Sequence, residues 1–143
     1  MDFYTDLIEI AIYSCLGVIL MVAANFFVDL IIPCSFPEEI KKGNNAVGFV
    51  SAGINVGVGI LLRAAIYSPS QIIREETLLT GIISSILYFS AGIIFFVLGY
   101  LAIRLINRKY ELNSEIGRGN TSAGIMVAGI FIGIAILISG VIM

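Results

Sequence analysis

The sequence predicts an all-α membrane protein with four transmembrane helices, built from two parallel two-helix repeats. The 143 residues are 59% hydrophobic and only 13% charged, about half the charged share of a soluble domain. A motif near the middle of the chain also recurs near its end. Four stretches hold no Asp, Glu, Lys or Arg: residues 11–28, 43–62, 77–103 and 119–143. The remaining polar chain is too short to coat a soluble globule, which excludes a soluble enzyme, a nucleic-acid binder and a disulfide-stapled secreted domain.

The four charge-free stretches, extended by their apolar flanks, predict the four spans. A span needs about 20 apolar residues, and it must be helical because lipid offers backbone groups no hydrogen-bond partners. Pro33 and Pro37 end the first span, Ser68-Pro69-Ser70 ends the second, and the polar segment 107–119 separates the third from the fourth. The predicted helices cover residues 7–32, 45–67, 77–106 and 121–143.

The distribution of basic residues predicts the orientation in the cell membrane, because cytoplasmic loops carry an excess of Lys and Arg. The loops after the first and third spans hold six basic residues, and the opposite side holds Arg63 and Arg74. The first and third loops are therefore expected in the cytoplasm, and both termini outside. The six are Lys41, Lys42, Arg104, Arg108, Lys109 and Arg118.

An internal repeat divides the chain into two units of two spans each, residues 1–69 and 70–143. A shift of 76 residues aligns residues 39–66 with residues 115–142, and 12 of these 28 positions are identical. Apolar composition alone would not place Glu, Gly and Asn of the loops in the same register. An even number of spans gives both units the same orientation, which predicts a pseudo-twofold axis along the membrane normal.

A Gly-Asn pair followed by small residues and glycines opens both repeated helices. It reads Gly43-Asn44-Asn45-Ala46 in the first unit and Gly119-Asn120-Thr121-Ser122 in the second. In this feature the sequence resembles the YjfL-like family of small multi-pass inner-membrane proteins, whose two-span domain of unknown function commonly occurs twice per chain. The resemblance covers nearly the whole chain and implies a plasma-membrane protein. It also implies a link to membrane-stress or envelope-modification systems.

The repeated motif can serve as a helix start or as an anion site. Asn44 and Asn120 are placed to cap the helices that follow them, and Gly43 and Gly119 permit a sharp turn before each cap. A helix N-terminus beside basic side chains could alternatively hold a lipid phosphate or another anion.

Glycines in the second and fourth spans are expected to pack helices together. Gly53-x-x-x-Gly57 and Gly129-x-x-x-Gly133 are small-xxx-small pairs that permit close approach of two helices. Because the pairs recur in the same register, we expect the second and fourth spans to pack through these faces. The glycines expected at helix contacts are Gly48, Gly53, Gly57, Gly124, Gly129 and Gly133.

Four polar side chains of the predicted spans are candidates for function by default, because polar groups in lipid are costly. They are Asn25, Asp29, Asn55 and Arg63. In the alternative interpretation, Asn55 bonds a neighbouring helix, Asp29 is a satisfied interfacial charge and Arg63 snorkels to the surface. At 1.5 Å per residue, Glu9, or failing that Asp6, lies close enough in depth to Arg63 to be its expected partner.

These observations favour an oligomeric structural or interaction protein over an enzyme. The sequence holds no His and no nucleophile–base pair or metal-ligand cluster, so we expect no catalytic residues, no metal and no cofactor. The expected partners are membrane lipids, other copies of the chain and a possible peripheral protein at the cytoplasmic loops, and no nucleic acid. The alternative is a small oligomeric channel or transporter whose polar path is lined by Asn25, Asp29, Asn55 and Arg63.

Overall fold

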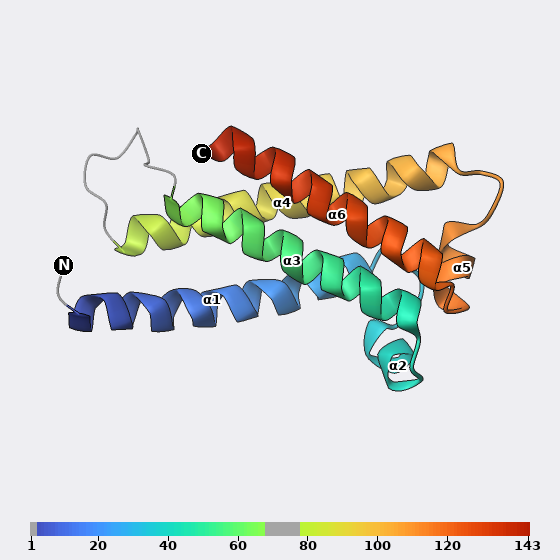
Figure 1. Ribbon diagram of the computed structural model, residues 1–143, viewed down its shortest axis with the longest axis horizontal. Helices are drawn as coiled ribbons and strands as arrows, with labels where there is room; N and C mark the ends of the chain where they lie inside the picture. The colour runs from blue at the N-terminus through green and yellow to red at the C-terminus, as the bar shows by residue number, and fades with distance from the viewer. Residues whose placement is uncertain (1–2, 68–77) are drawn as a thin grey trace.

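The computed structural model describes residues 3–67 and 78–143, which form a bundle of long helices with two short ones at one end (Figure 1). The four long helices are apolar enough to cross a membrane. The first begins and ends earlier than predicted, and the predicted break at residues 68–70 lies outside the described residues. The elements are α1 Phe3–Asp29, α2 Phe36–Lys41, α3 Asn45–Tyr67, α4 Leu78–Ile106, α5 Leu112–Gly117 and α6 Thr121–Ile142.

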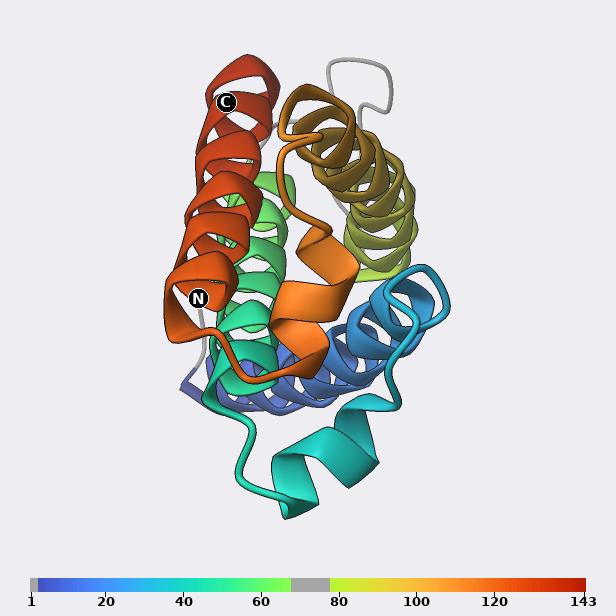
Figure 2. The same cartoon turned by 90° about the vertical axis from the view of Figure 1, so that its right-hand side faces the viewer.

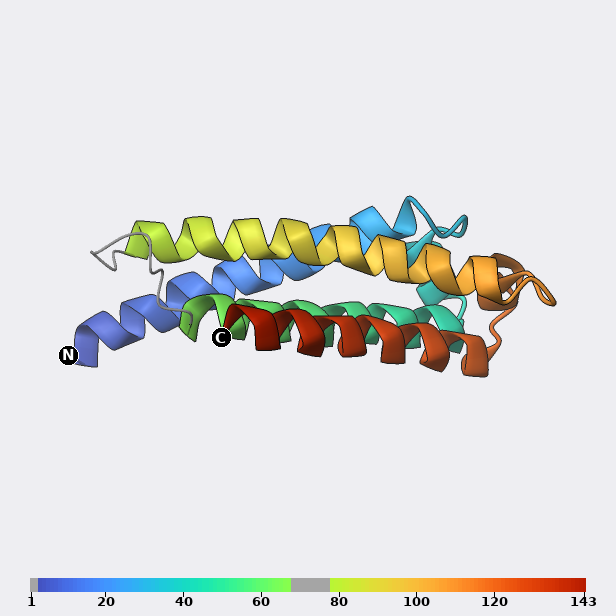
Figure 3. The same cartoon turned by 90° about the horizontal axis from the view of Figure 1, so that it is seen from above.

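The long helices alternate in direction along the chain. Helices α1 and α4 run one way, and α3 and α6 run side by side the other way (Figure 3). The N-terminus and the C-terminus therefore lie toward one end of the bundle, and α2 and α5 lie at the other (Figure 1). This is the arrangement expected of four consecutive spans.

Helix α3 lies at the centre of the bundle and contacts α1, α4 and α6 (Figure 2). Half of its most apolar 18-residue stretch is buried, against 17% in α1, 22% in α4 and 28% in α6. The core beside it contains Phe96 of α4 and Phe131 of α6, both fully buried, whose rings stack with centroids 5.0 Å apart. The other three spans therefore present most of their apolar surface to the surroundings, as lipid contact requires.

Close contact between α3 and α6 depends on two glycines. A Cβ atom on Gly53 would lie 2.5 Å from the Cα atom of Ala128 in α6. A Cβ atom on Gly124 would lie 2.4 Å from the carbonyl oxygen of Ala46 in α3. Both distances are shorter than any real Cβ contact, so the two backbones touch only because these side chains are absent.

The glycine contacts of α6 differ from those expected from the repeat. Gly57 faces Phe96, but a Cβ atom added to Gly48, Gly129 or Gly133 would meet no atom within 4 Å, so these three make no helix contact in the described chain. The reason is Phe131. It takes the place that Asn55 has in the first unit, and burying its ring turns α6 so that Gly129 and Gly133 face outward.

Candidate functional site

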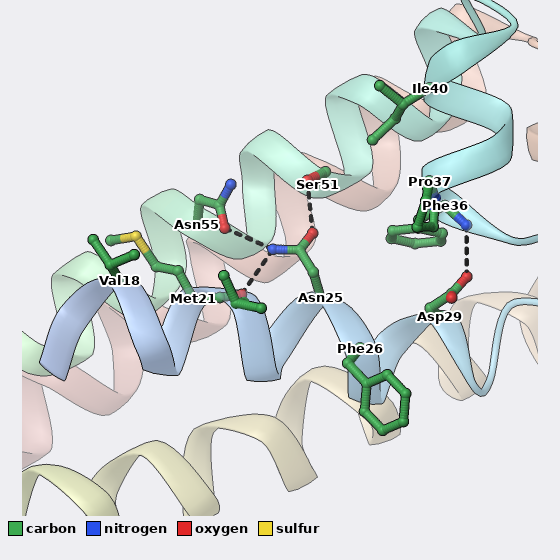
Figure 4. Close-up of a pocket in the computed structure, with 11 residues that line it drawn as sticks. Val18, Met21, Asn25, Phe26, Asp29, Phe36, Pro37, Ile40, Ser51 and Asn55 are labelled. Atoms are coloured by element: carbon green, nitrogen blue, oxygen red, sulfur yellow. Dashed lines mark hydrogen bonds between the residues drawn. The ribbon is translucent and has the colours of Figure 1, made fainter. Parts of the chain in front are cut away.

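The polar side chains of the spans gather along a groove between α1 and α3. The part at half the depth of α3 is a pocket of about 540 Å³, which we call the mid-depth pocket. Its walls hold three of the four candidates predicted from the sequence, Asn25, Asp29 and Asn55, together with Ser51 (Figure 4). The fourth candidate, Arg63, lines a second pocket nearer the termini.

Asn25 holds the mid-depth pocket together by hydrogen bonds across the two helices (Figure 4). Its amide nitrogen donates to Asn55 Oδ1 at 2.7 Å and to the carbonyl oxygen of Met21 at 2.8 Å. Its Oδ1 accepts a 2.6 Å hydrogen bond from the hydroxyl of Ser51. The Asn25 side chain is thereby fully satisfied, whereas the amide nitrogen of Asn55 has no protein partner among the described residues.

Sequence reasoning missed Ser51, although a signal was present. Ser51 lies four residues before Asn55, which places both on the same face of a helix. The second unit has Val127 and Phe131 at the corresponding positions, so the polar pair exists in the first unit alone. The difference explains why α3 turns this face toward a groove, while α6 buries the equivalent face in the core.

Asp29 closes the other end of the mid-depth pocket. It is the last residue of α1, and its carboxylate accepts a 2.8 Å hydrogen bond from the backbone N–H of Phe36, the first residue of α2. A carboxylate is stabilised at this place because it satisfies an unpaired N–H at the start of a helix. Asp29 therefore fixes the turn between α1 and α2.

Arg63 lies at the end of the groove near the termini, together with Asp6 and Glu9. The expected ion pair with Glu9 is absent, because no carboxylate of the described residues lies within 4.0 Å of its guanidinium. The Arg63 guanidinium carbon instead lies 5.7 Å from the centroid of the Tyr67 ring, a cation–π contact.

The repeated motif forms the same turn at both of its occurrences. Gly43 and Gly119 have φ angles of +80° and +83°, a left-handed conformation that side chains with a Cβ rarely adopt. Asn44 N–H donates to Glu39 O, and Asn120 N–H donates to Glu115 O, both at 2.9 Å. In each copy, the glycine N–H also donates to the carbonyl oxygen of the residue that follows this Glu. The two bonds together form a Schellman motif, which ends α2 and α5.

The two asparagines of the motif cap the following helices. Asn44 Oδ1 accepts from Val47 N–H, and Asn120 Oδ1 accepts from Ser122 N–H, both at 3.1 Å. Their amide nitrogens donate to Glu39 at 2.9 Å and to Glu115 at 2.7 Å. The hydrogen bond from Asn44, followed by that from Lys42, lowers the pKa of the Glu39 carboxyl.

Asn44 also joins the two copies of the motif. Its amide nitrogen lies 3.0 Å from the carbonyl oxygen of Ile116 and 3.2 Å from that of Gly117, both in the last turn of α5. The bond to Gly117 satisfies a carbonyl group that the end of a short helix leaves open, whereas the carbonyl oxygen of Ile116 also accepts from Gly119 N–H. The side chain that could have received an anion thus already bonds protein groups on every side.

Comparison with known proteins places the chain in a family. Residues 2–142 match the family described as Domain of Unknown Function (DUF350). The chain belongs to the DUF350 family. This agrees with the resemblance drawn from the Gly-Asn motif at the level of a transmembrane family of unknown function. The names that the comparison gives are DUF350 for the family and UPF0719 for the relatives, and the name YjfL is not among them.

Two relatives are named as transmembrane proteins. A UPF0719 transmembrane protein of Aquifex aeolicus (strain VF5) is 28% identical over 137 residues, which are 95% of this chain and 50% of the relative. The UPF0719 transmembrane protein YshE of Bacillus subtilis (strain 168) is 22% identical over 139 residues, 96% of each chain. The chain thus spans about half the length of the Aquifex relative. No solved structure matches it. The protein is a multi-pass transmembrane protein with four spans.

Proposed function

We propose that this protein is an oligomeric, non-enzymatic interaction protein of the plasma membrane, in support of envelope or membrane-stress functions. The observation that carries the proposal is the α6 glycine face, formed by Gly129, Gly133 and Gly140. None of the three has an atom within 4 Å of its Cβ position. Glycines four residues apart permit close approach of a second helix. Because α6 packs on α3 through other residues, this face remains open to a second copy of the chain.

Two further observations support an interaction protein. The Aquifex relative is about twice as long as the matched segment, so it has room for a second unit of this size. The sequence lacks His, the side chain that most often transfers protons in catalysis near neutral pH.

Within this proposal, the chain consists of two parallel repeats. Helices α2 and α5 begin 76 residues apart, as do α3 and α6, and the same Schellman turn joins each pair. The α3–α6 contact departs from twofold symmetry, because the two helices meet through Gly53 and Gly124, which are not equivalent in the repeat. We attribute the departure to divergence of Asn55 and Phe131.

The proposal also includes the orientation that the basic residues predict. With both termini outside the cell, α2 and α5 face the cytoplasm. Lys42 and Arg118 then form the exposed surface at which a peripheral protein could bind, each with an acidic neighbour one turn away.

A second candidate function is conduction through an oligomer. The observation in its favour is the mid-depth pocket, where the amide nitrogen of Asn55, without a partner among the described residues, lines a cavity shared with Asn25 and Asp29. If several copies turned these grooves toward a common axis, the polar side chains would line a path.

Native mass spectrometry of the protein released from lipid nanodiscs, combined with ion and solute flux into proteoliposomes, tests the two candidates. The interaction proposal predicts masses at multiples of 15.4 kDa, dissociation of the oligomer by Gly133→Leu and no flux above empty liposomes. A single-chain mass for the wild type would contradict it. Flux that Asn55→Leu abolishes would establish the second candidate.

A further inference from the structure

The groove between α1 and α3 continues from the mid-depth pocket toward the termini as a second pocket of about 570 Å³. We call it the terminal pocket. The two pockets share Val18 and Met21, so they form one groove. Its volume lies in the range of small-molecule binding sites, and as a groove between two spans it opens toward lipid.

Charges of both signs face the terminal pocket without neutralising one another. Asp6 and Glu9 come from α1, and Arg63 comes from α3. No ion pair within 4.0 Å joins them in the described part of the chain. Among the described residues that line it, two carboxylates and one guanidinium sum to a net charge of −1, with a positive and a negative side.

These charges lie at the depth of lipid headgroups. At 1.5 Å per residue, Arg63 is about 6 Å from the end of α3, and Glu9 is about 9 Å from the start of α1. Further along the groove, Val18 and Met21 form an apolar wall before the polar side chains of the mid-depth pocket. A molecule that fits must therefore combine a zwitterionic head with an apolar tail.

We propose that the terminal pocket binds a zwitterionic phospholipid with a primary ammonium group, of the phosphatidylethanolamine class. The phosphate pairs with the Arg63 guanidinium, which can bind it through two N–H groups. The ammonium donates to Asp6 and Glu9, and one acyl chain follows the apolar groove past Val18 and Met21. The lipid comes from the leaflet on the side of the termini.

The charge pattern also discriminates against other lipids. Phosphatidylcholine carries a quaternary ammonium that has no N–H group to donate, so it loses the hydrogen bonds to the carboxylates. Phosphatidylglycerol lacks the cation, and its net negative charge meets two carboxylates and one arginine. Lipid binding of this kind depends on the groove alone and holds whether or not the chain forms the oligomer proposed above.

The test uses the full chain purified in detergent and native mass spectrometry with dioleoyl phosphatidylethanolamine, phosphatidylcholine or phosphatidylglycerol added separately. We expect the wild type to retain phosphatidylethanolamine about fivefold better than either other lipid, the effect of one hydrogen bond relative to phosphatidylcholine and of one charge pair near a surface relative to phosphatidylglycerol. Arg63→Gln should lose about fivefold in retention, and Arg63→Lys should restore part of it. The double variant Asp6→Asn, Glu9→Gln should bind phosphatidylethanolamine and phosphatidylcholine equally.

A groove-filling variant tests the site without changing a charge. Gly59 lines the terminal pocket, and a Cβ there would meet only the Met21 methyl carbon at 3.7 Å. Gly59→Leu should therefore fold and bind less of every lipid. The matched control is Gly48→Leu on the same helix, where nothing lies within 4 Å, and Arg118→Gln is the matched charge control.

Three results would overturn the proposal. Equal retention of the three lipids by the wild type would show that the pocket does not discriminate between headgroups. Retention by Arg63→Gln equal to that of Arg118→Gln would remove the phosphate contact. A change in oligomer mass in Arg63→Gln with unchanged lipid retention would mean that a second copy, and not a lipid, covers the groove.

Discussion

Replacing Gly53 by Ala should destabilise the protein, whereas the same replacement at Gly129 should not. The two glycines occupy equivalent positions in the sequence repeat, 76 residues apart. In the structure, however, a Cβ on Gly53 would lie 2.5 Å from the Cα and 2.9 Å from the carbonyl oxygen of Ala128. A Cβ on Gly129 would meet nothing within 4 Å. Because the residue change is the same at both positions, the difference between the two variants measures the contribution of the packing of α3 on α6.

The size of the effect follows from the kind of atoms that collide. The atoms opposite Gly53 belong mainly to the backbone of α6, so no change of rotamer can relieve the overlap. The two helices must separate by about 1 Å to restore ordinary contact, and neighbouring core contacts are lost with them. Overpacking costs about 1–3 kcal/mol, and we expect Gly53→Ala near the upper end of that range. Gly129→Ala should leave the unfolding free energy of the single chain, measured where detergent has dissociated the oligomer, within about 0.5 kcal/mol of the wild type.

Reversible unfolding in mixed micelles with increasing sodium dodecyl sulfate, followed by far-ultraviolet circular dichroism, measures both free energies. Equal destabilisation by the two variants would refute the reasoning, since it would mean that α3 and α6 pack symmetrically through equivalent glycines. Wild-type stability of Gly53→Ala would show that the two helices do not approach closely at this point.

Three further predictions concern the α2/α5 end and the orientation. Asn44→Ala should cost about 1 kcal/mol more unfolding free energy than Asn120→Ala, because Asn44 caps α3 and also bonds the end of α5. Asn44→Ala should also raise the pKa of Glu39 measured by carboxyl NMR. In the wild type that pKa is lowered, so the stabilisation from Glu39 is present above the ordinary Glu pKa and disappears as the pH falls through the lowered value. In a background without native cysteines, an impermeant maleimide added to intact cells should label Ser70→Cys and spare Lys109→Cys.

Each of these has a result that contradicts it. Equal losses from the two asparagine substitutions would mean that the contact between the two motifs contributes nothing. If the pKa of Glu39 is the same in Asn44→Ala as in the wild type, the hydrogen bond from Asn44 is not the main cause of the lowered pKa. Labelling of Lys109→Cys but not Ser70→Cys would reverse the orientation. Ser70 itself lies outside the described residues, and this experiment needs only its side of the membrane.

The sequence predicts the spans well because their signal is local. Residues 45–67 form a helix that begins at the predicted residue, since the motif before it is a strong signal for a helix start. The first span is less well predicted. Helix α1 ends at Asp29, three residues before the predicted end, because the Asp29 carboxylate turns the chain into α2 by bonding Phe36 N–H. That bond joins residues of two different helices, so it produces no hydropathy pattern from which the end of α1 could be predicted.

The faces of the helices could not be predicted from the repeat, because they depend on tertiary packing. Glycine spacing identifies surfaces that allow close approach but does not say which neighbour uses them. The polar pair Ser51 and Asn55, against Val127 and Phe131, accounts for which face each helix buries, since apolar side chains gain by burial and polar ones require hydrogen-bond partners. The same difference explains why the polar groove lies between α1 and α3, whereas the stacked rings of Phe96 and Phe131 lie between α4 and α6.

Disulfide cross-linking at position 133 in native membranes tests the proposed oligomer most directly. In a background without Cys15 and Cys34, Gly133→Cys should form a disulfide between two chains, because a shared glycine face brings the two Cα atoms within the distance of about 4.4–6.8 Å that a disulfide spans. Ile94→Cys on the exposed side of α4, where the side chain is 59% exposed, is the control and should remain a single chain. We expect a cross-linked dimer at position 133 alone. A single chain at position 133, or equal cross-linking at both positions, would contradict the proposed oligomer.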